Sequence, residues 1–242
     1  APDLKFARET ANAIGANHHE LVYTEADMIS SLGEIIYYLE SFDAALVRSA
    51  FPCYFVSKLA KENGVKVILT GEGADEVFAG YEYLKGYTEP EILQKELRFI
   101  TSALHNTNLQ RVDRMTMANS VEGRVPFLDV AFVQFALSLP PELKITTGEK
   151  MEKSLLREAF QGWIPDSILW RKKEKFSKGA GSSHIISEKA DKEISDAEFE
   201  EECLLNNGLR LRSKEELYYY RIFKEHFPAE SAVNLIGRSR SI

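Results

Sequence analysis

Apolar residues recur at helical spacing in the first part of the chain. Residues 3–14, 25–42 and 50–63 repeat apolar positions every three or four residues, so we expect a helix over each range. Gly64 is placed to cap the third of these helices. Between the first two, residues 18–24 (HHELVYT) predict a short strand.

A short apolar run then predicts a buried strand. Residues 65–70 (VKVILT) contain Val65, Val67, Ile68 and Leu69, which form a nearly continuous, mostly β-branched set. Such a run is typical of a strand that is covered on both faces in a parallel sheet. We therefore expect an α/β fold built on a parallel sheet.

After residue 87 the pattern becomes mainly helical, with prolines as breaks. The expected helices cover residues 90–105, 109–119, 130–139, 151–160, 187–205 and 213–227. No internal repeat is found in the chain. We therefore divide the chain into an α/β part, residues 1–87, and a mainly helical part, residues 88–242.

Composition narrows the class of protein. The 242 residues carry a formal net charge of -7, which argues against a protein that binds nucleic acid by covering its phosphates with basic residues. Cys53 and Cys203 have neither the spacing of a zinc site nor that of a disulfide framework. No apolar stretch is long enough for a membrane span, and the first residues do not resemble a signal peptide. These features predict a soluble cytoplasmic protein that binds neither membrane nor nucleic acid.

An acidic loop follows the predicted buried strand. The stretch LTGEGADEVFAGY, residues 69–81, contains Glu72, Asp75 and Glu76. In open parallel sheets ligands bind beyond the carboxyl ends of the strands, so the loop is a candidate site for a metal ion or a substrate ammonium group. Alternatively, the acids only occupy the first turn of a helix, where the helix dipole favours negative charge.

A basic cluster stands out from this acidic chain. The stretch WRKKEKFSKG contains five cations: Arg171, Lys172, Lys173, Lys175 and Lys178. The cluster could grip polyphosphate, or it could be a solvated basic face that only resembles a targeting signal.

Two further charged positions remain open. Arg48 could bind an anion or could pair with Asp43. In VEGRVPFLD, residues 121–129, Glu122, Arg124 and Asp129 could form an internal ion pair that supports a turn, or could take part in chemistry.

Several long strings occur together and in order in this chain. They are LTGEGADEVFAGY, NLQRVDRMTMANSVEGRVPFLD, MEKSLLREAFQGWIPDSILWRKKEKFSKG and SKEELYYYRIFKEHFP. Together they resemble the C-terminal synthetase domain of glutamine-hydrolysing asparagine synthetases, and the resemblance extends over most of the chain. It implies a partial parallel sheet of the ATP-pyrophosphatase type, similar to the adenine nucleotide alpha hydrolases, with a mostly helical C-terminal lobe. Residues 1–87 would then be the nucleotide-binding part.

The resemblance also implies an activity in asparagine biosynthesis. A carboxylate of aspartate would attack the α-phosphate of ATP, giving β-aspartyl-AMP and pyrophosphate, and ammonia would then displace AMP. The implied cofactors are ATP and Mg²⁺, because the charge that develops on departing pyrophosphate must be neutralised. The ammonia would come from glutamine through a glutaminase domain. A homodimer is compatible with the resemblance.

Matching motifs imply roles for single residues. Thr70 and Gly71 would contact the nucleotide, and Lys173 would grip pyrophosphate. Arg48 would hold an anionic group of the substrate or intermediate.

The two acids of the loop would divide the remaining tasks. Glu72 would support formation or breakdown of the adenylate, and it could orient the incoming ammonia or accept a proton from it. Asp75 would help to hold metal or substrate.

The chain departs from the family pattern in three respects. It contains no phosphate-cradling loop of the form SGGxDS and no glutaminase domain with an N-terminal cysteine, so we expect these 242 residues to be inactive alone. Ala45 and Leu46 stand where many asparagine synthetases have two threonines. The alternatives are therefore a related adenylating amide ligase, similar to β-lactam synthetases, or a truncated module without catalysis.

Overall fold

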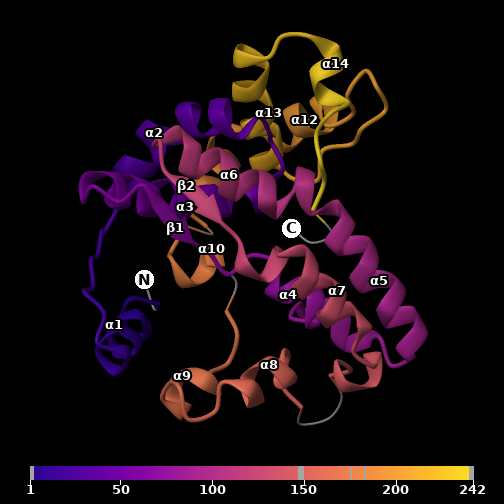
Figure 1. The fold of residues 1–242 in the computed structure, drawn as a ribbon. Coiled ribbons are helices and arrows are strands. Elements are labelled where there is room, and N and C mark those ends of the chain that lie inside the picture. Colours follow the sequence, from indigo (N-terminus) through magenta and orange to yellow (C-terminus); the bar gives the residue numbers. More distant parts are fainter. Residues whose placement is uncertain (1–2, 147–149, 175, 183, 240–242) are drawn as a thin grey trace.

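The computed structural model describes residues 3–146, 150–174, 176–182 and 184–239 (Figure 1). The α-helices are α1 (Asp3–Ile14), α2 (Glu25–Leu39), α3 (Ala44–Glu62), α4 (Ala74–Val77), α5 (Pro90–Ser102), α6 (Asn108–Ala118), α7 (Val130–Ser138), α8 (Ser154–Ala159), α9 (Asp166–Leu169), α10 (Phe176–Gly179), α11 (Ile185–Glu193), α12 (Asp196–Glu202), α13 (Lys214–His226) and α14 (Glu230–Val233). Short 3-10 helices span Glu82–Gly86, Ala103–Asn106, Pro126–Leu128 and Pro141–Leu143. The strands are β1 (Val67–Leu69) and β2 (Glu122–Arg124).

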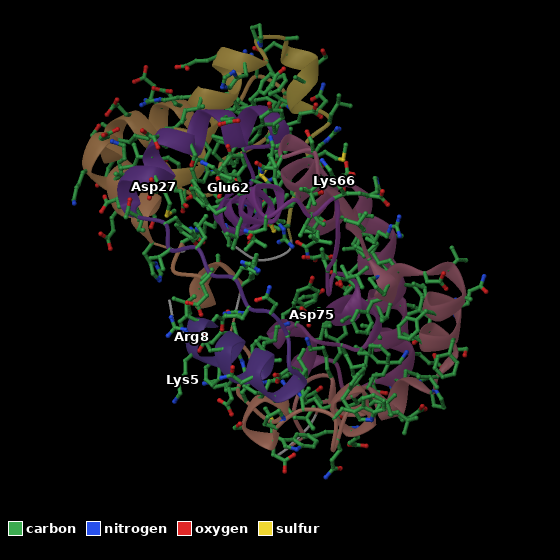
Figure 2. All side chains as sticks on the ribbon, turned by 60° about the vertical axis from the view of Figure 1, so that its left-hand side comes forward. Lys5, Arg8, Asp27, Glu62, Lys66 and Asp75 are labelled. Carbon is green, nitrogen blue, oxygen red and sulfur yellow. The ribbon has the colours of Figure 1, made fainter. Side chains whose placement is uncertain are left out.

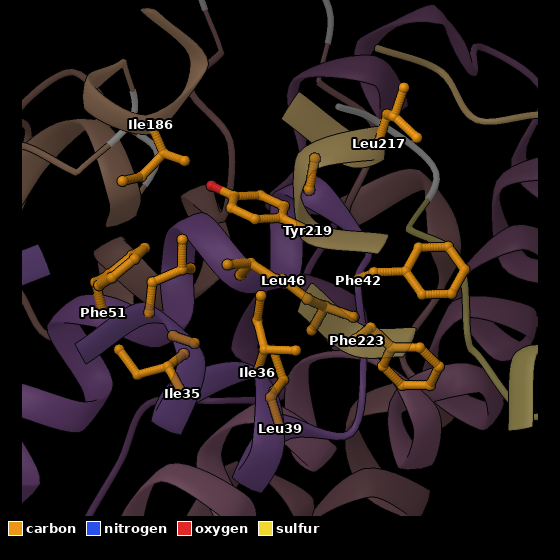
Figure 3. Packing of buried hydrophobic residues seen from close by; sticks show 14 of the residues in the cluster. Ile35, Ile36, Leu39, Phe42, Leu46, Phe51, Ile186, Leu217, Tyr219 and Phe223 are labelled. Carbon is orange, nitrogen blue, oxygen red and sulfur yellow. The ribbon is translucent and has the colours of Figure 1, made fainter. Parts of the chain in front are cut away.

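The main hydrophobic core lies between α2, α3 and α13. Apolar residues of α2 and α3 pack against Tyr219 and Phe223 of α13, and these side chains are almost fully buried (Figure 3). α6 packs along α3 on another side. Helices from both parts of the chain therefore share one core, while the division at residue 87 stays a prediction.

Helix α2 lies within the range that its periodicity predicts, and its ends have clear local causes. The Thr24 side chain accepts a hydrogen bond from the Asp27 N–H, and Asp27 bonds back to Thr24, which completes a capping box. At the other end Glu40 adopts a left-handed conformation with φ 53°. The helix therefore stops before the segment that leads to α3.

Helix α3 begins earlier than predicted. The apolar periodicity predicted a start at residue 50, whereas α3 begins at Ala44 and contains Pro52. The true N-terminal cap is Asp43, whose side chain accepts a hydrogen bond from the Leu46 N–H at 3.1 Å. This earlier start places Arg48 within the helix.

The sheet consists, among the described residues, of the parallel pair β1 and β2, with Val67 opposite Glu122. The parallel direction agrees with the predicted α/β class. The expectation that both faces of β1 are covered is wrong, because the Leu69 side chain is 73% exposed. Among the described residues only β2 pairs with β1, so β1 is an edge strand and not a central strand of a larger sheet.

The predicted strand at residues 18–24 is also not found. The alternation of the sequence is real, because Tyr23 stacks on Phe55 with ring centroids 4.7 Å apart while Val22 is exposed. However, no strand lies beside this segment among the described residues, so alternate burial occurs without sheet pairing.

The later helices largely follow their predicted ranges, with one exception. The single helix expected over residues 187–205 is divided into α11 and α12. The Ser195 side chain accepts a hydrogen bond from the Glu198 N–H and forms a capping box, which begins a new helix there. In Figure 1, α8 and α9 lie at one end of the molecule with α1 nearby, and α12 to α14 lie at the other end. None of the described helices is long and apolar enough to cross a membrane.

Candidate active site

A cavity of about 610 Å³ opens between segments that are far apart in the sequence. Its walls come from the start of α3, the acidic loop with α4, the end of α5 with the 3-10 helix that follows it, the start of α6, Lys173 with the start of α10, and residues 236–239. The four residues for which the sequence predicts catalytic roles all line it: Arg48, Glu72, Asp75 and Lys173. Figure 2 shows Asp75 near the middle of the molecule.

Two glycines fix the acidic loop. Gly73 has φ 96° and caps α4, and a Cβ atom there would lie 2.4 Å from Leu128 Cδ2. A Cβ atom on Gly80 would lie 1.9 Å from the Asp75 Oδ1 atom. Only glycine can therefore occupy either position without moving a neighbour.

Asp75 lies between two lysines at the cavity wall. Its Oδ1 atom is 2.6 Å from Lys173 Nζ and 2.9 Å from Lys153 Nζ. Burial acts to raise the pKa of Asp75, but the two ammonium groups outweigh it and hold the pKa below its usual value. Burial lowers the pKa of Lys173.

Lys173 is held from three sides. Besides the Asp75 contact, its Nζ donates a hydrogen bond to the Gly80 carbonyl at 2.7 Å and lies 5.0 Å from the centre of the Tyr81 ring. The long side chain is thus aimed at the cavity by groups of the acidic loop.

Glu72 forms an ion pair with Arg111 of α6. Arg111 is only 6% exposed and also lines the cavity, so the pair is largely shielded from water. Breaking a buried pair by removing one partner is costly because the other charge stays buried. Sequence reasoning missed Arg111, because the predicted helix began at residue 109, whereas α6 begins at Asn108 and places Asn108 and Arg111 on one face.

The third acid of the loop is a buried group. Glu76 is 2% exposed, accepts a hydrogen bond from the Tyr81 hydroxyl and also contacts the Asn108 amide at 3.3 Å. Burial raises the pKa of Glu76 and also that of Tyr81. Glu76 and Tyr81 both line the cavity, so the loop places side by side two carboxyl groups, those of Asp75 and Glu76, whose pKa values shift in opposite directions.

Arg48 does not pair with Asp43, which excludes one of the two interpretations of its sequence position. It binds Glu215 of α13 instead, with its Nε 2.9 Å from Oε1. Asp43 binds Arg212 at 2.6 Å and Ser239. Arg48 thus lines the cavity while it is paired with Glu215, a partner that the sequence did not indicate.

Thr70 and Gly71 follow β1 directly but are not among the residues that line this cavity. The Thr70 N–H donates to the Arg124 carbonyl at 2.8 Å. Its Oγ1 atom is buried and has no hydrogen-bond partner among the described residues.

The basic cluster does not act as one surface. Arg171 pairs with Asp3 at 2.7 Å, and Lys178 pairs with Glu174 at 2.9 Å. Lys175 lies outside the described residues. Of the four described cations, Lys173 is the one that lines the cavity together with the acidic loop.

The Glu122–Arg124 pair lies on β2, away from the cavity lining. The two side chains are 2.7 Å apart and more than half exposed. The predicted ion pair is therefore present, but it is exposed rather than internal, and neither residue lines the cavity.

The described residues hold no group of three or more His, Cys, Asp or Glu side chains that could bind a metal ion by themselves. Mg²⁺ prefers oxygen ligands and is usually held by one or two carboxylates together with substrate phosphates. Asp75 lines the cavity and offers such a carboxylate, so the residues fit an ion that arrives with a nucleotide.

Comparisons with known proteins identify relatives over the whole chain. The family model described as asparagine synthase matches residues 1–95 and 87–240. Asparagine synthetase B [glutamine-hydrolyzing] of Escherichia coli (strain K12) is 37% identical over 244 residues, covering 100% of this chain and 44% of that protein. A probable asparagine synthetase [glutamine-hydrolyzing] of Dictyostelium discoideum is 36% identical, covering 98% of this chain and 45% of the relative.

A plant relative gives the same result. Asparagine synthetase [glutamine-hydrolyzing] 2 of Lotus japonicus is 38% identical, with 96% of this chain and 41% of the relative covered. The chain thus spans less than half the length of these curated relatives. The match of the family model over nearly all residues shows that this chain belongs to the asparagine synthase family.

Proposed function

We propose that this chain is the synthetase part of an ATP-dependent ligase that converts aspartate to asparagine through β-aspartyl-AMP, releasing pyrophosphate and AMP. One observation carries the proposal: Arg48, Glu72, Asp75 and Lys173, which come from three distant segments, line one cavity. Family membership supports the reaction class.

Lys173 binds the pyrophosphate group in this proposal. Its ammonium already faces a carboxylate in the cavity wall, so an anionic phosphate can replace or share that partner. A cation fixed beside a departing group stabilises the charge that develops there, and it does so most strongly where water is excluded. Asp75 keeps Lys173 in place until the substrate binds.

Mg²⁺, when bound, supplies charge neutralisation on the phosphates, and Asp75 would help to hold it. Thr70 and Gly71 contact the nucleotide in this proposal. The Thr70 hydroxyl oxygen is buried and has no hydrogen-bond partner in the described part of the chain, which supports this role because such a group is costly unless a ligand or water satisfies it.

Glu72 acts at the acyl centre. Arg111 pairs with the Glu72 carboxylate and fixes its orientation at the cavity wall. An amine that attacks an acyl adenylate must lose a proton, and a fixed carboxylate can orient the amine or accept that proton.

The nitrogen source lies outside this chain. The relatives are named as glutamine-hydrolysing enzymes, and this chain covers less than half of their length. We propose that ammonia reaches the cavity from a glutaminase that is not contained in these residues, and that the 242 residues alone have little or no activity.

The test is a product assay on the protein with its native flanking residues. Incubation with ATP, Mg²⁺, aspartate and either glutamine or ammonium should give asparagine and pyrophosphate in equal amounts, whereas omission of aspartate should abolish both. Pyrophosphate release that does not depend on aspartate, without any asparagine, would contradict the proposal.

A second candidate is an adenylating amide ligase for another carboxylate. Ala45 and Leu46 line the cavity and bring no hydroxyl groups to it. A panel of amino acids and other carboxylates in the same assay separates the two candidates, because pyrophosphate release then depends on a carboxylate other than aspartate.

A further inference from the structure

Two side chains of α13 stand behind Arg48 and have no role in the proposed chemistry. Glu215 is 3% exposed, and its carboxylate accepts hydrogen bonds from Arg48 Nε at 2.9 and 3.0 Å. Arg48 Nη2 contacts the same carboxylate. Tyr219, which is fully buried, donates its hydroxyl hydrogen to Glu215 Oε1 at 2.7 Å. These contacts join residues that are 167 positions apart in the chain.

The pairing leaves one side of the guanidinium available. Arg48 Nη1 has no hydrogen-bond partner among the described residues, while Arg48 lines the cavity and its side chain is 20% exposed. The main chain is fixed as well, because Ser182 Oγ donates to the Arg48 carbonyl at 2.8 Å. Glu215 and Ser182 thus fix Arg48, while part of its guanidinium group faces the cavity.

Charge compensation changes how such an arginine recognises a ligand. Because Glu215 neutralises it, the pair attracts anions weakly from a distance. The planar guanidinium instead offers N–H groups in fixed directions that match a carboxylate or phosphate. Recognition at this end of the cavity then depends on the orientation of Arg48 rather than on excess charge.

We infer that Glu215 and Tyr219 are positioning residues that orient Arg48 to bind an anionic group, either the carboxylate of the acyl substrate or a phosphate of the nucleotide. This inference rests on the proposed function of the cavity. Neither residue touches the ligand; both act through Arg48. The Tyr219–Glu215 hydrogen bond contributes to this positioning, because it holds the carboxylate that orients Arg48.

The test compares two tyrosines of α13. Tyr219→Phe removes the hydrogen bond to Glu215 and little else, whereas Tyr220→Phe removes a hydroxyl that makes no hydrogen bond to the described residues. We expect Tyr219→Phe to raise the KM of one substrate about threefold to tenfold, the effect of losing one hydrogen bond, with little change in kcat. A change in the KM for aspartate identifies a carboxylate, and a change in the KM for ATP identifies a phosphate. Tyr220→Phe should change neither.

A double-mutant cycle adds a second readout. If Glu215 acts through Arg48, the effects of Glu215→Gln and Arg48→Lys on the same KM should be less than additive when combined. Equal KM values in Tyr219→Phe and Tyr220→Phe, or a loss in kcat with both KM values unchanged, would overturn the positioning role.

Dissociation constants of the same proteins for ATP and aspartate, measured by calorimetry, separate the two proposals. If the wild-type protein forms asparagine but Tyr219→Phe and Tyr220→Phe have the same dissociation constants, the inference is overturned and the proposed function stands. A protein that forms no asparagine, but whose ligand affinity falls in Tyr219→Phe, overturns the function and supports the inference. Absence of binding to either ligand overturns both.

Discussion

The two ends of the cavity hold their charges differently. At one end Asp75 has two cationic partners, Lys173, which lines the cavity, and Lys153, which does not, so two ammonium groups share one carboxylate. At the other end Arg48 faces one carboxylate, Glu215, and the charges balance. The first arrangement suits a highly charged leaving group, whose negative charge grows during reaction. The second suits recognition by geometry. The difference indicates that one cavity can stabilise a highly charged group with ammonium groups and recognise another anionic group through the fixed directions of its hydrogen bonds.

The largest expected effect is at the lysine end. Lys173→Met should lower kcat about a hundredfold to a thousandfold, because it removes a fixed cation from the place where charge develops. Steady-state rates of asparagine formation measure this. Lys178→Met is the matched control, since Lys178 lies in the same stretch, is largely exposed and pairs with Glu174. Equal rates in the two variants would remove the proposed difference between the ends.

The next effect tests how Asp75 is placed. Gly80→Ala puts a methyl group where the Asp75 carboxylate lies, so the loop must shift. We expect the free energy of unfolding to fall by about 1–3 kcal/mol, as in other overpacked sites, together with a loss of activity. Urea denaturation measures the change. In Gly86→Ala the added Cβ meets no atom within 4 Å, so that variant should keep the stability of the wild type.

A lysine with no acidic partner among the described residues sharpens the comparison. Lys144 is 3% exposed and donates to the Ala136 carbonyl, and burial lowers its pKa to about 8. The unfolded chain therefore binds more protons than the folded one between pH 8 and the ordinary lysine pKa of 10.5. The free energy of unfolding should rise with pH across this window, by about 1–3 kcal/mol at most. Lys144→Met should lose this rise, and an unchanged pH profile in that variant would contradict the assignment.

The smallest effect is expected at an ion pair in open solvent. Arg124→Ala breaks the exposed pair with Glu122, and such pairs contribute about 0–1 kcal/mol. Chemical denaturation should therefore show almost no change, and the residual effect should vanish at high salt. A loss as large as that expected for Gly80→Ala would mean that burial does not decide the strength of these pairs.

Sequence reasoning predicted part of the fold for physical reasons. Periodicity placed α2 and α13 well, because both helices bury one apolar face. It misplaced the start of α3, since the Asp43 cap is a local hydrogen bond that apolar spacing does not report. It also predicted a strand at residues 18–24, where alternation is present but a pairing strand is not found among the described residues.

The candidate site was predicted in the same uneven way. The motifs indicated the residues that converge on the cavity, but not which opposite charges would meet. Arg111 and Glu215 were missed because the contacts of each join segments that only the tertiary fold brings together. Lys153 was missed because it lies 20 residues from Lys173 and nothing in its own stretch indicates a shared partner, Asp75.

Residues 236–239 complete one wall of the cavity, and this has a consequence for synthesis of the protein. The main chain and hydroxyl of Ser239 bind Asp43, which is 196 residues earlier, and Gly237 packs so closely on Asn106 that a Cβ atom would lie 2.0 Å from its carbonyl oxygen. The ribosome makes the chain from its N-terminus, so Asp43, the cap of α3, lacks its Ser239 partner until this stretch has been synthesised. A nascent chain should therefore acquire the finished cavity only after Ser239 has left the exit tunnel.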